Sequence, residues 1–110
     1  MKILLVTDNL MEKARLASRW RREGAEVRFL EEDSPPDLVA VDLEASDAPA
    51  RIIGLREAYP QARCLAFGSH VDKAAFEAAK EAGAQDAVAR GAVAERVVGI
   101  ILRDTGSGTT

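Results

Sequence analysis

The sequence predicts an α/β domain built on a five-stranded parallel sheet with helices on both faces. Strand-like and helix-like segments alternate along the chain, and residues 2–7 and 38–42 are almost unbroken runs of Val, Ile, Leu and Ala. Continuously apolar strands are typical of sheets covered on both faces, and regular alternation with helices favours parallel pairing. The length of 110 residues fits one compact domain.

The first strand and helix are predicted over residues 2–7 and 10–23. Asp8 or Asn9 can cap the N-terminus of this helix, because short polar side chains accept hydrogen bonds from the free amides of a first helical turn. Gly24 is expected to end the helix, since glycine tolerates the backbone conformation that follows a last turn.

The next two strands are predicted over residues 26–30 and 38–42. Residues 31–37 contain two consecutive prolines and read as a loop, because proline lacks an amide donor and restricts its neighbour. A helix is therefore missing between the second and third strands. We expect this to leave one sheet face thinly covered, so that a partner or a large side chain such as Phe29 must exclude water there.

The second half of the chain continues the alternation. Pro60 and Gly83 mark helix ends, and residues 104–110 are rich in Gly, Ser and Thr, which predicts a flexible tail after a domain at 1–103. The expected elements are helices at 48–58, 71–82 and 92–103 and strands at 63–67 and 86–89.

Composition excludes several partners and sites. The net charge is −3, and acidic residues follow the small cluster of Arg19, Arg21 and Arg22, so we expect a solvated helix face and no nucleic-acid partner. No apolar stretch approaches the roughly 20 residues that span a bilayer, and no signal peptide is evident, so we expect no membrane partner and a cytoplasmic protein. Cys64 and His70 are the sole cysteine and histidine, which excludes an intrachain disulfide and a typical zinc site. No dinucleotide, Walker A or Ser-His-acid motif is present.

Two aspartates follow the two most apolar strands. Asp8 comes after residues 2–7, and Asp42 ends residues 38–42. Ligands of open α/β sheets bind outside the carboxyl ends of the strands, so both carboxylates are expected near one small polar site.

These segments together resemble a known family. Residues 3–9 (ILLVTDN), 36–43 (PDLVAVDL) and 82–88 (AGAQDAV) are similar to the receiver domain of two-component response regulators, a CheY-like domain, and the resemblance covers about residues 1–103. It implies a flavodoxin-like fold with strand order 2-1-3-4-5, from which this chain departs by its missing second helix.

The resemblance also implies roles for the acidic residues. Asp42 falls at the phosphoacceptor position, and Asp8 falls at the second acid of the pair that helps to hold Mg²⁺. Thr7 occupies the position of the first acid and removes one carboxylate. Glu44 is a candidate replacement, so the candidate metal ligands are Asp8, Asp42 and Glu44.

The switch positions depart from the family pattern. Gly68 falls where a hydroxyl residue belongs, with Ser69 beside it, and Arg90 falls where the lysine belongs. Arginine is a planar fork and does not replace the point charge of lysine. Gly68, Ser69 and His70 also fit a plain tight turn, and His70 is a further candidate base or ligand.

Structural roles stand beside these assignments. Asp8 can be a helix cap, and Asp42 can simply end a strand, because aspartate is common in turns. Arg90 can form an ion pair with Asp42 or Asp8, which we favour, since a fixed guanidinium would imitate a permanently engaged switch lysine.

Helix periodicity indicates a protein-binding surface. Phe76 points away from the apolar stripe of its helix, and Val98 and Leu102 lie off the stripe of the last helix. We expect these three residues to form a patch for a protein partner or a homodimer.

Three functions follow from these observations. The first is a degenerate, stand-alone receiver-like module that signals through protein contacts, independently of phosphorylation, and not as an enzyme. The second is a working phosphoacceptor that uses Asp42 with Mg²⁺ near Asp8. The third is a small-ligand binder that uses the same strand-end pocket.

Overall fold

The computed structural model describes the backbone of residues 1–107 and the side chains of residues 1–104. Within that part of the chain, five strands alternate with four α-helices, except between the second and third strands. The elements are β1 (Lys2–Val6), α1 (Leu10–Arg22), β2 (Glu26–Arg28), β3 (Leu38–Asp42), α2 (Ala48–Ala58), β4 (Arg63–Gly68), α3 (Lys73–Ala82), β5 (Asp86–Ala89), a 3₁₀ turn η1 (Arg90–Ala92) and α4 (Val93–Ser107).

The strands form one parallel sheet in the order β2-β1-β3-β4-β5, as the sequence and its resemblance predict. β1 lies at the point where the chain reverses its direction of travel across the sheet, between β2 and β3. The register places Asp42 beside Phe67, and Gly68 beside Ala89. The carboxyl ends of β3, β4 and β5 therefore meet at one edge of the sheet.

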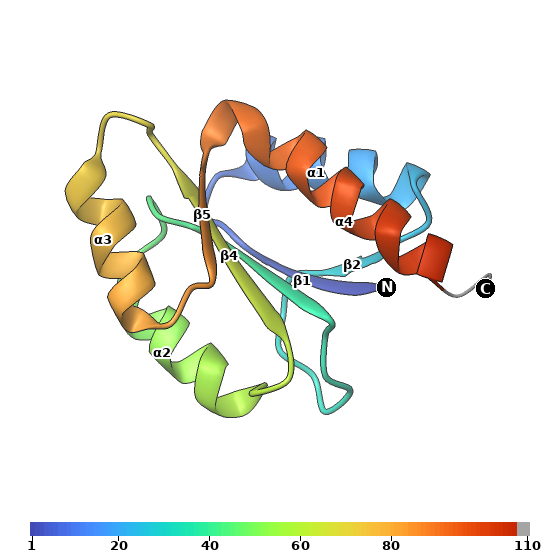
Figure 1. The fold of residues 1–110 in the computed structure, drawn as a ribbon, viewed down its shortest axis with the longest axis horizontal. Helices are drawn as coiled ribbons and strands as arrows, with labels where there is room; N and C mark the ends of the chain where they lie inside the picture. Colours follow the sequence, from blue (N-terminus) through green and yellow to red (C-terminus); the bar gives the residue numbers. More distant parts are fainter. Residues whose placement is uncertain (108–110) are drawn as a thin grey trace.

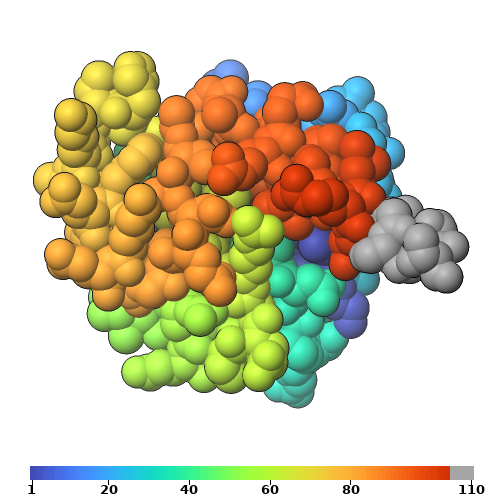
Figure 2. Space-filling model, in the orientation of Figure 1, coloured from blue at the N-terminus to red at the C-terminus, as the bar shows by residue number. Residues whose placement is uncertain are grey.

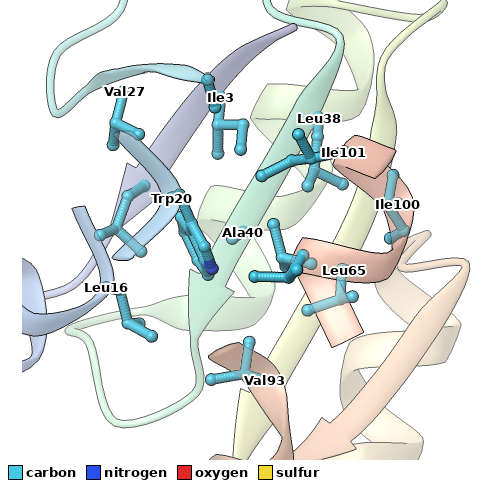
Figure 3. Packing of buried hydrophobic residues seen from close by; sticks show 14 of the residues in the cluster. Ile3, Leu16, Trp20, Val27, Leu38, Ala40, Leu65, Val93, Ile100 and Ile101 are labelled. Atoms are coloured by element: carbon cyan, nitrogen blue, oxygen red, sulfur yellow. The ribbon is translucent and has the colours of Figure 1, made fainter. Parts of the chain in front are cut away.

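One sheet face is covered by α1 and α4, which lie side by side (Figure 1). Trp20 is fully buried between these helices and the sheet, and its indole N–H donates to the carbonyl of Ala94 at 3.2 Å. Figure 3 shows the aliphatic side chains that surround it. The buried residues on this face include Ile3, Leu16, Val27, Leu38, Ala40, Leu65, Val93, Ile100 and Ile101.

The opposite face is covered by α2 and α3, which pack against β3, β4 and β5 (Figure 1). Its core includes Leu4, Val39, Ile52 and Leu55. Cys64 is buried there, and burial raises the pKa of its thiol to about 11, so the thiol stays protonated at neutral pH.

A loop replaces the helix between β2 and β3, as the prolines predict. It covers residues 29–37 and not 31–37, because β2 ends at Arg28 and not at residue 30 as expected. Tyr59, which ends α2, donates its hydroxyl hydrogen to the carbonyl of Glu32 at 3.0 Å. Lys2 Nζ donates to Ser34 Oγ at 2.6 Å, so the loop is fastened from two sides. The loop covers one part of the face beside β1 and β2 and leaves another part hollow, which partly confirms the predicted thin cover.

Two helix boundaries differ from the prediction. α4 continues to Ser107, past the expected end at residue 103, so the expected domain boundary at 103 falls inside a helix. The predicted tail extends over residues 104–110, of which 108–110 lie outside the described residues. α3 begins at Lys73, and not at residue 71 as expected, because Asp72 caps it by accepting the amide of Ala75. Val71 is therefore exposed in the preceding loop.

Among the helices described, none is long and apolar enough to cross a membrane.

Candidate functional site

The candidate site lies where the carboxyl ends of the central strands meet. Thr7 follows β1, Asp42 is the last residue of β3, and Arg90 begins the turn that follows β5. The parallel sheet brings these three side chains together although 83 positions separate Thr7 from Arg90 in the sequence. The sequence predicts a shared polar site for Asp8 and Asp42, whereas the side chains in direct contact at this edge are those of Asp42, Thr7 and Arg90.

Asp42 is 1% exposed, and four donors bind its carboxylate. Arg90 Nη2 donates to Oδ1 at 2.6 Å, and Nη1 donates to Oδ2 at 3.2 Å. The Thr7 hydroxyl donates to Oδ2 at 2.7 Å, and the Glu44 amide donates to Oδ1 at 2.9 Å. Each oxygen therefore accepts two hydrogen bonds, which uses about all four lone-pair positions of a carboxylate.

These contacts decide the charge of Asp42. Burial acts most strongly and would raise the pKa of this carboxyl group. The hydrogen bonds from Arg90, Glu44 and Thr7, together with the positive charge of Arg90, outweigh burial and hold the pKa below its ordinary value. Asp42 is therefore ionised at neutral pH. The hydrogen bond to Asp42 is also the main reason that the pKa of Arg90 is raised.

Arg90 lies among three carboxylates. Besides Asp42, it lies 3.3 Å from Glu12 and 3.2 Å from Glu44, and its guanidinium carbon stacks 5.3 Å from the centre of the Phe67 ring. Of the two partners left open by the sequence, Asp42 is the one that Arg90 binds. The sequence interpretation missed Glu12 and Phe67. The position of Glu12 in the sequence could have indicated this contact, because Glu12 lies in the first turn of α1, and α1 starts at this edge of the sheet.

Asp8 stands apart from this cluster. Its side chain accepts the Ser46 amide at 3.0 Å and lies 3.9 Å from Arg51, in an exposed position. The sequence left open whether Asp8 or Asn9 caps α1. Asn9 is the cap, because its side chain accepts the amide hydrogen of Glu12 at 3.0 Å.

The predicted Mg²⁺ ligands do not fit a metal ion. Asp8, Asp42 and Glu44 line one shallow hollow of about 260 Å³ together with Asn9. Within the described residues, however, no three acidic, histidine or cysteine side chains are grouped so that they could hold a metal. The guanidinium of Arg90 binds both Asp42 and Glu44, and it supplies the positive charge that a cation would bring.

At Gly68, the predicted position of the switch hydroxyl, packing against Leu43 leaves little room for a side chain. A Cβ atom added to Gly68 would lie 3.2 Å from Cβ of Leu43 and 3.3 Å from its Cδ1, so a hydroxyl residue fits only if Leu43 moves. Ser69 and His70 are exposed in the loop between β4 and α3. The turn interpretation of these residues agrees with their position, and His70 lies outside the cluster around Asp42.

The predicted interface patch is wrong in one of its three residues. Val98 is buried because α4 packs against both the sheet and α1. These two contacts together bury more of the α4 surface than a single row of residues. Phe76 is half-buried, and Leu102 is 55% exposed. α3 and α4 share the face seen in Figure 2, but they cover opposite faces of the sheet and are separated by β5 (Figure 1).

Comparison with known proteins identifies the fold. No protein-family profile matches the sequence, and no curated protein gives a significant match. Solved structures do match. A CheY-like response regulator receiver domain protein from Methanospirillum hungatei superposes with a TM-score of 0.80 at 14% identity, over 96% of this chain and 94% of that one.

Two further structures give the same result. A CheY-like protein, TadZ, from Pseudomonas aeruginosa has a TM-score of 0.75 and 24% identity, over 94% of this chain and 98% of that one. A response regulator from Burkholderia pseudomallei, solved with a phosphorylated aspartic acid, a calcium ion and citrate, has a TM-score of 0.78 and 23% identity over 88% of this chain. This chain spans 64% of that protein. The receiver-like, flavodoxin-like fold expected from the sequence is thus confirmed.

Proposed function

We propose that this domain is a receiver-like signalling module that acts through protein contacts, without phosphorylation of Asp42. One observation carries the proposal: the carboxylate that would accept a phosphoryl group already accepts four hydrogen bonds from the protein. A carboxylate that attacks phosphorus needs a free lone pair, and freeing one here means breaking a hydrogen bond in a buried site.

The residues at the positions that would assist phosphoryl transfer support the same proposal. The transferred group spreads negative charge over its oxygens, and receivers balance that charge with Mg²⁺ and a lysine. Here Thr7 replaces one acid and donates to Asp42, and Arg90 is held by three carboxylates. Two of the three carboxylates proposed to hold a metal, Asp42 and Glu44, instead hold this arginine.

Arg90 gives the module a fixed state. In the receiver pattern, a lysine after the fifth strand engages the phosphoryl group. Arg90 stands at that position and engages the bare carboxylate through two hydrogen bonds. We infer that the segment after β5 is held permanently in one arrangement, so that signalling depends on the availability of a partner.

The two alternative functions are less well supported. A working phosphoacceptor would need Asp8, Asp42 and Glu44 to gather around Mg²⁺, which requires Arg90 to leave. A small-ligand site would need a deeper cavity, because the hollow of about 260 Å³ beside Asp42 is below the roughly 300–1,000 Å³ of ordinary ligand pockets.

The test is phosphorylation with a small donor. The domain is incubated with Mg²⁺ and acetyl phosphate, or with beryllofluoride, and followed by intact mass and by backbone amide NMR shifts. The Asp42→Asn variant is the matched control, and a receiver domain known to accept phosphate verifies the reagents. Folding of each sample is checked by circular dichroism.

We expect no added mass and no shifts that depend on Asp42. A stable adduct that is lost in the Asp42→Asn variant would show a working receiver and overturn the proposal. Shifts caused by acetyl phosphate in the variant and in the original chain alike would point to the small-ligand alternative.

A further inference from the structure

The face of the sheet without a helix carries a hollow that is distinct from the Asp42 site. The hollow measures about 270 Å³ and lies between the start of the 29–37 loop and α2. Its floor is apolar, formed by Leu4 and Val6 of β1 and by Leu55 of α2. At Gly54, an added Cβ atom would meet no atom within 4 Å, so the wall formed by α2 is open to an incoming side chain.

An apolar side chain projects beside this hollow. Leu30 lines the hollow and is 78% exposed, although it is a large aliphatic residue. The same face therefore presents both an apolar projection and an apolar recess, and exposed apolar surface of this kind marks interaction sites.

The rim carries one charge of each sign. Glu31 lies on the loop side, and Arg51 lies on the α2 side. The side chain of Arg51 is 45% exposed, and its ion pair with Asp8 is long, at 3.9 Å, so its guanidinium can also reach a carboxylate on another molecule. A strongly acidic or basic partner would meet repulsion at one side of this rim, whereas a surface with both charges would not.

The sheet edge next to the hollow is protected against strand addition. β2 is three residues long, and Arg21 donates a hydrogen bond of 2.8 Å to the carbonyl of Val27 on that strand. Short strands and charged side chains at an edge oppose pairing with another strand. A partner therefore approaches the face of the sheet and not its edge.

We propose that this face binds a second copy of the same chain, in a two-fold symmetric dimer. Two-fold interfaces are self-complementary, so each element of the patch must find its complement in the same patch. Leu30 of each chain enters the recess above Gly54 of the other. Glu31 of each chain pairs with Arg51 of the other, which gives two equivalent ion pairs. This dimer supplies the cover that the missing helix leaves out, and it does not involve Asp42 or Arg90.

The first test is the molecular mass in solution as a function of concentration. Sedimentation equilibrium is measured from roughly 1 µM to 1 mM, a range that brackets the weak association expected of a small interface. We expect a reversible dimer. The Leu30→Glu variant should weaken dimerisation by at least about tenfold, because a carboxylate cannot enter the apolar recess without losing its hydration. The Leu102→Glu variant changes an exposed leucine on α4 and should leave the dissociation constant unchanged.

The second test uses charge reversal. Glu31→Arg and Arg51→Glu chains should each be monomeric, because each places like charges opposite one another in both symmetric contacts. An equimolar mixture of the two variants should form a heterodimer, since both contacts then become attractive. Circular dichroism verifies that each variant is folded.

Three results would overturn this dimer: a monomer at every concentration, an effect of Leu102→Glu in place of Leu30→Glu, or a mixture that stays monomeric. None of them bears on phosphorylation of Asp42, so the two proposals succeed or fail separately.

Discussion

Arg90 binds the carboxylate of Asp42 through both terminal nitrogens, with the shorter contact at 2.6 Å. Asp42 ends β3 and Arg90 follows β5, so this pair joins two strands that are separated in the sheet by β4. A two-point contact between guanidinium and carboxylate is stronger and more strictly oriented than a single ionic contact. The pair therefore acts as a structural link across the edge where a receiver performs its chemistry.

Removing Arg90 should destabilise the domain. In Arg90→Ala, the buried carboxylate of Asp42 keeps only the Thr7 and Glu44 donors, and we expect a loss of about 2 kcal/mol in the free energy of unfolding. Urea denaturation measures this change. The control is Arg15→Ala, which removes an exposed ion pair with Glu12 and should cost less than about 1 kcal/mol. Equal losses in both variants would contradict the buried link.

Thr7 should matter through its hydroxyl group. Thr7→Val keeps the branched shape but removes the donor to Asp42 Oδ2 and the acceptor of the Asn9 amide. We expect a loss of about 1–2 kcal/mol in the free energy of unfolding. Thr7→Ser keeps the hydroxyl and should cost clearly less. If Thr7→Val cost no more than Thr7→Ser, the hydroxyl group would not be the main contribution of this side chain to stability.

Acid should weaken the fold through Asp42. The folded-state pKa of this carboxyl group lies below its ordinary value of 3.8, so its contribution is present above that value and is lost as the pH falls through the folded-state pKa. We expect the urea concentration at the unfolding midpoint to decrease when the pH is lowered below about 4. In carboxyl NMR, Asp42 should titrate below its ordinary pKa of 3.8.

In Arg90→Ala, burial is opposed by fewer donors, so the pKa of Asp42 should rise. The loss of stability should then begin at a higher pH than in the original chain. A carboxyl titration of Asp42 that is unchanged by removal of Arg90 would contradict the assigned cause of the shift.

Much of the fold could be predicted because each strand carries its own signal. The apolar runs of β1 and β3 and the paired prolines before β3 are local features, and the structure agrees with them. The pairing of Arg90 with Asp42 was one of two options, because separation along the sequence does not show which acid faces an arginine. The contact with Glu12 depends on how α1 is rotated at the sheet edge, which the local pattern leaves open.

Side-chain exposure was harder to predict from periodicity. Val98 lies off a single helical stripe, yet it is buried because α4 contacts two surfaces at once. The sequence pattern places Val71 in a helix, but this helix begins two residues later, because Asp72 caps its N-terminus. The sequence predicts that this sheet face is thinly covered, but it does not predict the hollow beside Leu30. The shape of the hollow depends on where the 29–37 loop is attached to the rest of the domain.

Val98 and Leu102 should respond differently to the same change. Val98→Asp places a carboxylate in the core between α1 and α4, and we expect a loss of at least about 3 kcal/mol or failure to fold. Leu102→Asp changes an exposed residue and should cost less than about 0.5 kcal/mol. Thermal denaturation distinguishes the two, and a tolerated Val98→Asp would restore this residue to the surface patch that the sequence predicted.

Arg28 should contribute to stability mainly through its hydrocarbon stem. Arg28 ends β2 and is 8% exposed. Its guanidinium donates to Glu32 at 3.2 Å and to the carbonyl of Ser34. Its Nε has no hydrogen-bond partner within the described part of the chain. Replacing a buried charge by an apolar residue of similar size is often neutral or stabilising. We therefore expect Arg28→Met to change the free energy of unfolding by less than about 1 kcal/mol. Arg28→Ala should cost roughly 2 kcal/mol, because it leaves a cavity beneath the loop. Urea denaturation compares the two variants, and an equally large loss in Arg28→Met would show that the polar contacts of Arg28 hold the 29–37 loop in place.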